Sequence, residues 1–345
     1  MSKVIYLPFE PLPQRYTEMW NDAFIAQMSD EDVIVDVPGT KQSIIENGEF
    51  LDTFGTIEYK TKQMEQVVKL FKYHVIKDGD TFFVPDIFYP SLASIRYMAE
   101  LTGIKVNIVA FNHAGRADEQ DFVQRLGDWA DTQEQAWHDM VDVVLVGSLF
   151  HAEKVKRCFN PASVVVTGAI WDSQWMKEKT KDITFTKENY IIYPHRPCAE
   201  KDFLLFLEIA RVNPTLRFVI TSCGNNRLEG VALPDNVEYR YNLTKHEYFN
   251  IFAHAKGYLS TAKQETFGYT LQEAIFFGCN IIVPNRACYA EYADAKSIVD
   301  VDNMKKPYYL TELFNNSPYL QKSVNVADNT KKVYDICQYI NLKTK

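Results

Sequence analysis

The sequence predicts an α/β protein of two domains, each built on a parallel sheet with helices on both faces. Short apolar segments of strand length alternate with segments of helical periodicity along most of the chain. The 345 residues are enough for two domains of ordinary size. A polar and weakly patterned segment, 168–187, separates two halves with the same alternation. These three observations together define the fold class.

The first half alternates between predicted strands and helices. The helix at 64–75 is typical, because Val67, Phe71 and Val75 fall on one face. Consecutive strands joined by helices pair in parallel. The predicted strands are 3–8, 33–37, 81–85, 105–111, 141–146 and 163–167, and the predicted helices are 64–75, 92–101, 121–139 and 150–159.

The second half repeats this style. Its predicted strands are 190–193, 217–221, 237–241, 257–260 and 281–284, and its predicted helices are 202–212, 245–254, 268–277 and a final one at about 330–340. The expected domains are residues 1–170 and 171–325, with 326–345 forming a C-terminal helix that packs back toward the N-terminal domain. Ligands bind at the carboxyl ends of parallel strands, so we expect a site in a cleft between the domains.

Composition excludes several classes of protein. With 46% hydrophobic residues the chain is too apolar for disorder, and its net charge of -8 argues against a general nucleic-acid coat. The six cysteines form no CxxC pair, which favours reduced thiols in a cytoplasmic protein over a zinc ribbon. No apolar run of about 18 residues is present, and the N-terminal apolar run is too short for a signal peptide. We therefore expect no stable membrane insertion.

Two glutamates carry the strongest chemical signal. Glu265 and Glu273 flank a Phe-Gly turn, and Gly268 begins a predicted helix that carries Glu273. The amides of a helix N-terminus, here around Gly268, Tyr269 and Thr270, suit the oxygens of a diphosphate. Glu273 can then hold a ribose diol, and Glu265 lies where a sugar on the diphosphate would sit. The alternative is a helix cap with solvated glutamates.

Three further segments follow predicted strands. Arg196 and Lys201 lie in 193–202 and can neutralise a departing diphosphate without a metal; the alternative is a charged helix start. His113 is a candidate site residue because it follows the strand at 105–111, where its imidazole is expected to face the cleft; a structural histidine is the alternative. Gly224 belongs to a polar turn, 223–226, that resembles a nucleotide-binding glycine turn.

The segment around Glu265 and Glu273 resembles the E-x7-E signature of retaining GT-B glycosyltransferases, especially those of the fourth family. The resemblance implies a GT-B fold, in which two Rossmann-like domains have parallel sheets facing a central cleft. It also implies transfer of a hexosyl or pentosyl group from a nucleotide diphosphate sugar, with UDP-sugar favoured, to an acceptor hydroxyl. Glu265 would contact the donor sugar and Glu273 the ribose, while Phe267, Gly268 and Tyr269 would supply backbone contacts.

The chain departs from the family pattern at several places. His195 and Asp202 replace glycines beside Arg196 and Lys201, and Arg286 and Tyr289 replace glycines of a donor-side loop. The segment 9–16 replaces a glycine-glycine loop after the first strand, and 37–41 offers a second candidate loop. The pattern Asp300-Val301-Asp302 matches a metal-binding motif of a different fold, so we expect no metal and no cofactor beyond the donor sugar.

The acceptor is the least defined partner. Compact phage enzymes of this type glycosylate hydroxymethylated DNA bases, which makes modified DNA the leading specific acceptor and a host cytoplasm the location. Polysaccharide, lipid or small-molecule acceptors are alternatives, as is a non-catalytic protein that binds sugar nucleotides. A basic face in the first domain would serve DNA, although a solvated charged surface explains the same residues; they are Lys41, Lys60, Lys62, Lys154, Lys156 and Arg157.

Overall fold

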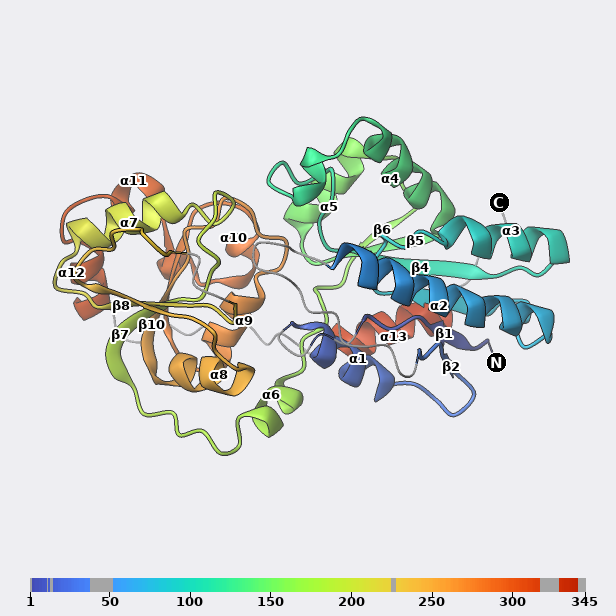
Figure 1. Ribbon diagram of the computed structural model, residues 1–345, viewed down its shortest axis with the longest axis horizontal. Coiled ribbons are helices and arrows are strands. Elements are labelled where there is room, and N and C mark those ends of the chain that lie inside the picture. The colour runs from blue at the N-terminus through green and yellow to red at the C-terminus, as the bar shows by residue number, and fades with distance from the viewer. Residues whose placement is uncertain are drawn as a thin grey trace. The chain divides into compact units, whose positions relative to one another are not determined.

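The computed structural model describes residues 2–10, 12, 15–37, 52–224, 228–316 and 329–340. It divides into two compact units, Met1–Asp172 with Asp328–Lys345, and Ser173–Ala327 (Figure 1). The described residues of each unit form a parallel six-stranded sheet flanked by helices. The predicted fold class, two Rossmann-like α/β domains, is therefore confirmed.

The sheet of the first unit changes its direction of growth between β1 and β3. The strand order is β2-β1-β3-β4-β5-β6, so the chain adds β2 on one side of β1 and every later strand on the other. Ligands of open α/β sheets bind at such a switch point, beyond the carboxyl ends of the strands. The strands are β1 (Val4–Tyr6), β2 (Val33–Ile34), β3 (Thr81–Val84), β4 (Asn107–Asn112), β5 (Val143–Val146) and β6 (Val164–Val166).

Different helices cover the two faces of this sheet. Alternate strand residues such as Ile5, Phe82 and Ile108 pack with apolar residues of four helices, namely α2 (Thr53–Lys72), α3 (Leu92–Thr102), α4 (Trp129–Met140) and α5 (Leu149–Cys158). The opposite face packs against α1 (Thr17–Ile25) and α13 (Asn329–Tyr339), where Phe24 lies 4.5 Å from Phe83 between ring centroids. The last helix, red in Figure 1, thus lies beside α1 near the start of the chain.

The sheet of the second unit has its switch point between β7 and β10. Its order is β12-β11-β10-β7-β8-β9, which corresponds to the dinucleotide-binding order 3-2-1-4-5-6 when its strands are counted from the first. The strands are β7 (Glu188–Tyr193), β8 (Phe218–Thr221), β9 (Val237–Arg240), β10 (Ala255–Leu259), β11 (Asn280–Pro284) and β12 (Ile298–Val299).

Helices also cover both faces of this second sheet. Phe206 of α7 (Phe203–Val212) stacks on Tyr193 at 4.1 Å, and α12 (Tyr309–Asn316) shares that face. On the other face, Phe252 of α8 (Lys245–His254) stacks on Tyr258 at 6.2 Å, and α9 (Tyr269–Phe276) contacts β10 and β11. Shorter helices are α6 (Ser173–Lys179), α10 (Tyr289–Tyr292) and α11 (Val301–Met304), with a 3-10 turn, η2, at Ala295–Ser297.

Gly257 of β10 is a point of close approach between this sheet and α12. A Cβ added there would lie 2.5 Å from Cε2 of Phe314 and 3.1 Å from Cγ1 of Ile191. Gly257→Ala should therefore lower the free energy of unfolding of the second unit by about 1–3 kcal/mol, because both neighbours are buried and must shift. Urea unfolding measures this. Gly127→Ala is the matched control, since its Cβ meets only Trp129 at an ordinary 3.4 Å; an equal loss there would contradict the explanation.

Two predictions for the first unit are wrong in detail. The single helix expected at 121–139 is divided into a 3-10 turn, η1 (Phe122–Arg125), and α4, because Leu126 adopts an extended conformation before Gly127. Helix α1 was missed, although Met19, Trp20, Ala23 and Phe24 form its buried face. The segment 168–187, interpreted from the sequence as the passage between the domains, contains the short helix α6.

Candidate functional site

The candidate donor residues of the second unit lie beyond the two strands that flank its switch point. His195, Arg196 and Lys201 follow β7, whereas Glu265 and Gly268 follow β10. These two strands are direct neighbours in the sheet, paired through Gly257 with Ile191 and Tyr258 with Ile192. The fold therefore brings two segments together that are about 60 positions apart in sequence, at the edge where open α/β sheets bind ligands.

Lys201 is held between two carboxylates. Its Nζ lies 2.7 Å from Oε1 of Glu265 and 2.7 Å from Oε1 of Glu200, and its side chain is only 12% exposed. Burial on its own lowers the pKa of the Lys201 ammonium, but Glu265 and Glu200 outweigh it and raise the pKa above its ordinary value. Lys201 thus keeps its positive charge at any physiological pH.

Arg196 and His195 complete this side of the edge. Nη2 of Arg196 lies 3.5 Å from Oε2 of Glu200, so Glu200 links the two cations. His195 is buried, and burial, with Lys201 and Arg196 nearby, lowers its pKa well below the usual value. Its Nε2 lies 3.4 Å from the hydroxyl of Tyr258. The imidazole that replaces the family's glycine is therefore a neutral packing group.

Helix α9 begins at a residue whose backbone conformation favours glycine. Gly268 is its N-cap with φ 77°, in the left-handed region. The first intrahelical bonds are donated by the amides of Leu271 and Gln272 to the Gly268 carbonyl, so the amides before them have no acceptor within the helix. The side chain of Phe267 is buried between Tyr269 and Tyr292, which leaves it only backbone groups to offer.

Polar partners fix the rest of this helix. The hydroxyl of Thr270 lies 3.0 Å from that of Tyr258. Glu273 is 6% exposed, accepts a short hydrogen bond from the Tyr248 hydroxyl, and lies 3.4 Å from Nζ of Lys245. Both partners come from α8. The ion pair between Glu273 and Lys245 is therefore a long one, and a ribose hydroxyl can replace Lys245 as a partner of the carboxylate.

Three other residues that the sequence placed near the donor are Gly224, Arg286 and Tyr289. Gly224 follows β8, where its carbonyl accepts the amide of Asn242 at 2.8 Å. The side chain of Arg286 is bound within the unit, because it donates to Asp202 Oδ2 at 3.0 Å and to the Ala262 carbonyl at 2.9 Å. The Tyr289 hydroxyl lies 2.5 Å from Ser260 Oγ. These two side chains fasten the loop after β11 to the rest of the unit.

His113 belongs to the first unit, in the loop after β4. Its Nε2 lies 2.8 Å from the Pro85 carbonyl, which accepts only, so Nε2 carries a proton and Nδ1 is the basic nitrogen of the neutral ring. Burial lowers the pKa of His113, and Asp86 only partly opposes this. The ring also packs against Phe111 at 4.5 Å and Trp20 at 5.0 Å.

A buried polar chain supports the loop that carries His113. Asn112 receives a hydrogen bond at its Oδ1 from Nε2 of His151 at 2.9 Å, and its Nδ2 lies 3.4 Å from Nε2 of His138. His151 lies in the first turn of α5, where its amide donates to Oγ of the N-cap residue Ser148 at 3.2 Å. Farther along the loop, Glu134 accepts the amide of Arg116 at 2.9 Å.

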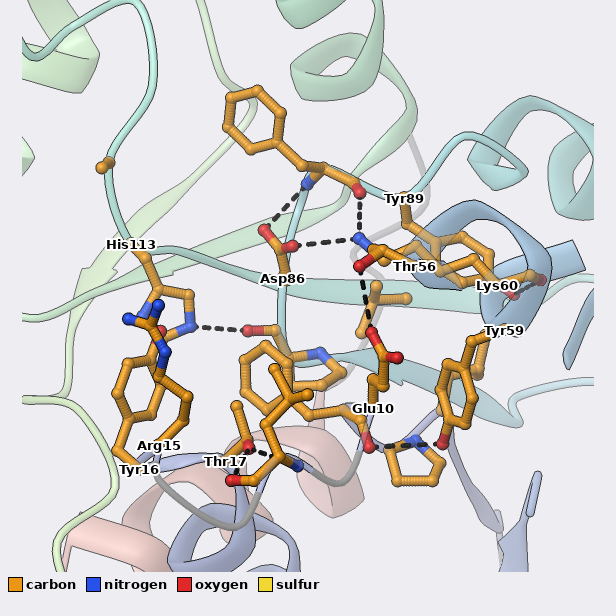
Figure 2. Close-up of a pocket in the computed structure, with 18 of the residues that line it drawn as sticks. Glu10, Arg15, Tyr16, Thr17, Thr56, Tyr59, Lys60, Asp86, Tyr89 and His113 are labelled. Atoms are coloured by element: carbon orange, nitrogen blue, oxygen red, sulfur yellow. Dashed lines mark hydrogen bonds and ion pairs between the residues drawn. The ribbon is translucent and has the colours of Figure 1, made fainter. Parts of the chain in front are cut away.

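A cavity of about 130 Å³ opens beside His113 (Figure 2). It is lined by residues that follow β1, β3 and β4 and by residues of α2, so it lies at the switch point of the first sheet. Lys60 enters its wall and lies 3.0 Å from Asp86 Oδ2. Burial disfavours the charged form of Asp86, yet Lys60 prevails and the pKa of that carboxyl falls below its ordinary value.

The sequence-predicted residues therefore fall into groups. Arg196, Lys201 and Glu265 form one ionic network through Glu200, whereas His113 lies in the other unit. Sequence reasoning missed Lys245, Tyr248, Glu200 and Asp86; only the position of Asp86 directly after a strand offered a signal. Of the loops 9–16 and 37–41, the residues 11, 13, 14 and 38–41 lie outside the described part of the chain.

The expected basic face is not uniform. Lys60 is only 14% exposed in its ion pair with Asp86, so its assignment to an exposed basic surface is wrong. Lys62 pairs with Glu58 at 2.6 Å, and Lys154 lies over the ring of Phe150. Lys41 lies outside the described residues. Both Lys60 and Lys62 of α2 therefore form ion pairs with carboxylates of the protein itself.

Solved structures resemble the chain over nearly its whole length. A sucrose-phosphate synthase from Thermosynechococcus elongatus has a TM-score of 0.68 at 12% identity, covering 98% of this chain and 96% of its own. The lipopolysaccharide outer core galactosyltransferase WaaB has a TM-score of 0.62 at 11% identity, with 96% and 98% covered. HepE from Anabaena, in complex with UDP and glucose, has a TM-score of 0.60 at 10% identity, with 98% and 95% covered. No protein-family model and no curated sequence matches the chain.

These likenesses identify the fold as GT-B. At such low identity they carry the fold alone, and the chemistry must be argued from this chain's own residues. Within the described residues, no group of three His, Cys, Asp or Glu side chains is placed to share a metal ion. In the same part of the chain, no helix is both long and apolar enough to span a membrane.

Proposed function

We propose that the protein is a glycosyltransferase that moves a sugar from a nucleotide diphosphate sugar, with UDP-sugar favoured, to an acceptor hydroxyl. The observation that carries the proposal is the cluster at the switch point of the second unit. There, the N-terminus of α9 follows Glu265, which pairs with Lys201, and Glu200 links Lys201 to Arg196. Similar solved structures include a galactosyltransferase and a protein in complex with UDP and glucose, which agrees with this assignment.

Each donor group has a partner of matching chemistry. Amides at Gly268, Tyr269 and Thr270 face the diphosphate oxygens at the positive end of α9. Glu273 accepts hydrogen bonds from the hydroxyls of the ribose. Gly224 follows β8 and is assigned to the nucleotide. Glu265 accepts hydroxyls of the donor sugar, while Arg196 and Lys201 neutralise the diphosphate. On binding, the diphosphate takes over contacts that the two cations now make with Glu200.

The proposed reaction needs no covalent enzyme intermediate. The bond between the anomeric carbon and the diphosphate oxygen breaks as the acceptor oxygen bonds to the same carbon on the same face, which retains configuration. The acceptor proton passes to the departing diphosphate. Lys201 and Arg196 stabilise the negative charge that develops on that leaving group.

Glu273→Gln tests the donor half of the proposal. The change keeps the side chain's shape but removes the charge that two ribose hydroxyls would contact, so the affinity for UDP should fall about tenfold. Isothermal titration measures this. Glu238→Gln is the matched control, because Glu238 also pairs with arginines of the second unit but lies on the edge strand β9. Unchanged UDP affinity in Glu273→Gln would contradict the assigned role.

The acceptor class is tested by direct comparison. Transfer from labelled UDP-glucose and other UDP-sugars is measured with hydroxymethylated DNA, an oligosaccharide, a lipid extract and small alcohols side by side. Release of UDP together with a labelled product supports the transferase. Tight UDP-sugar binding with neither release nor transfer would instead favour a non-catalytic sugar-nucleotide-binding protein.

A further inference from the structure

The cavity beside His113 has its own ligand chemistry. It is formed within the first unit by the segments after β1, β3 and β4 and by α2, and it measures about 130 Å³. A cavity of about 150 Å³ in another protein binds benzene, so the present one matches about one small planar ring in size. A branched oligosaccharide would require a longer groove.

Aromatic side chains contribute several parts of the walls. They come from four separate segments of the first unit, and they are Phe9, Tyr16, Tyr59, Phe88, Tyr89 and Phe122. Aromatic rings gain from stacked and edge-to-face contact with another ring, beyond the burial of their area. Figure 2 shows Tyr16, Tyr59 and Tyr89 around the same space as His113. The walls therefore favour a flat apolar body.

The polar groups of the walls are already engaged with the protein. The Tyr59 hydroxyl donates to the Phe9 carbonyl at 3.2 Å, and the Tyr89 hydroxyl donates to the Lys60 carbonyl at 3.3 Å. Nε2 of Gln63 donates to the Pro8 carbonyl at 2.8 Å. A sugar with many hydroxyls would lose its hydrogen bonds to water and find few new partners, which disfavours its binding here.

The charged groups of the walls are paired in the same way. Oγ1 of Thr56 donates to Oε2 of Glu10 at 3.0 Å, and Nζ of Lys60 donates to Asp86. Lys60 also donates a short hydrogen bond to the Phe88 carbonyl, which fixes one aromatic wall. These pairs hold the cavity in shape without presenting the row of open donors and acceptors that polyol recognition requires.

At one side of the cavity the His113 ring offers a different group. Because Nε2 donates to the Pro85 carbonyl, Nδ1 of the neutral ring is able to accept one hydrogen bond. We propose that this cavity binds a single planar aromatic ring bearing a hydroxyl or hydroxymethyl group, and that His113 orients this hydroxyl as the acceptor. This inference rests on the proposed glycosyl transfer and names the substrate class of its acceptor half.

Binding and transfer are tested with defined probes. The full chain is titrated with 4-hydroxybenzyl alcohol, 5-hydroxymethyl-deoxycytidine and maltose, and then each is offered as acceptor with labelled UDP-glucose. A ring probe should bind and become labelled, whereas maltose should do neither. Oligonucleotides with and without hydroxymethylcytosine, single-stranded and duplex, distinguish a base in DNA from a free aromatic molecule, and labelling of either source supports the inference.

A cavity-filling variant ties the binding to this place. Ala114 lines the cavity, so Ala114→Trp should weaken binding of the ring probes about tenfold or more. Ala93→Trp on the exposed side of α3 is the matched control and should leave probe binding unchanged. Thermal unfolding of both variants shows whether each is folded.

The outcomes separate the two levels of the proposal. If wild-type protein binds UDP and labels maltose but binds no ring probe, the aromatic acceptor is wrong and the glycosyltransferase stands. If ring probes bind with the Ala114 dependence but no UDP-sugar binds, the glycosyltransferase is wrong and the cavity assignment stands as a binding site only. Ring binding that persists in Ala114→Trp would overturn the placement in this cavity.

Discussion

Replacing Lys201 by methionine should lower the rate of sugar transfer by about 10²- to 10³-fold, the loss typical of removing one preorganised charge-stabilising group. The ammonium is in place before any ligand arrives, since two carboxylates at 2.7 Å hold it and its side chain is 12% exposed. A diphosphate leaving group gains negative charge as its bond to the sugar breaks. We therefore expect kcat to fall more than the affinity for UDP, as measured by initial rates and titration.

A double variant separates catalysis from folding. Lys201→Met alone leaves Glu200 and Glu265 facing each other without their shared cation, which destabilises the unit. Adding Glu200→Gln removes one of these charges without touching the donor-sugar contact assigned to Glu265, so the double variant should recover thermal stability but not turnover. Recovery of turnover as well would mean that Lys201 serves only to neutralise the carboxylates beside it. Lys181→Met is the matched control, since Lys181 pairs with Glu178 at 2.5 Å on an exposed surface.

Sequence periodicity predicted many of the helices and strands because these elements depend mainly on neighbouring residues. The expected helix at 245–254 coincides with α8, and the strand ends after β7 and β10 lie where the motifs predicted them. Errors arose where a local signal competes with packing. Helix α1 was overlooked beside a proline-rich segment, although burial of Trp20 and Phe24 against the sheet stabilises it.

The candidate site was only partly accessible to such reasoning. Glu265 and Lys201 were each recognised, but their ion pair depends on β10 lying beside β7, which is set by strand order and not by local sequence. Tyr248 and Lys245 reach Glu273 from α8 for the same reason. The cavity beside His113 requires Lys60 to turn inward toward Asp86, a choice of side-chain direction that no sequence pattern records.

One topological rule accounts for both candidate ligand sites. In the first unit the cavity lies beyond the strands around the β1–β3 switch, and in the second the ionic cluster lies beyond β7 and β10. Connections leave the strands in opposite directions at a switch point, and a crevice remains there. The two sites differ in their residues. The cavity of the first unit has aromatic walls, whereas the cluster of the second unit consists of paired charges.

Acidification should unfold the first unit through its buried histidines. Burial lowers the pKa of His138 to about 4 and that of His151 to about 3, from an ordinary 6.5. Nε2 of His151 already donates to Oδ1 of Asn112, and its Nδ1 is buried without an acceptor among the described residues. Nε2 of His138 instead accepts from Nδ2 of Asn112, so a second proton on that nitrogen would face a donor. Below pH 6.5 these two histidines become protonated in the unfolded chain but stay neutral in the folded chain until lower pH.

The sign and size of the effect follow from these pKa values. Because the unfolded state binds more protons, the free energy of unfolding falls as pH decreases from 6.5 to 4, by on the order of 5 kcal/mol for the two histidines. Glu134 acts in the opposite direction, since burial raises its pKa to about 7 and the folded chain favours its protonated form. Its contribution is complete below about pH 4.5 and is lost as pH rises through 7.

Urea unfolding from pH 8 to 4 tests this with two variants. His151→Gln keeps a donor for Asn112 but cannot titrate, so its stability should fall less steeply with acid. Glu134→Gln should gain on the order of 2 kcal/mol at pH 8 and lose stability more steeply below pH 6.5. His246→Gln is the control, because His246 is 56% exposed in the other unit. Wild-type stability that stays constant from pH 6.5 to 4 would show that these histidines are not held neutral, since two protons are then taken up at no cost in folding free energy.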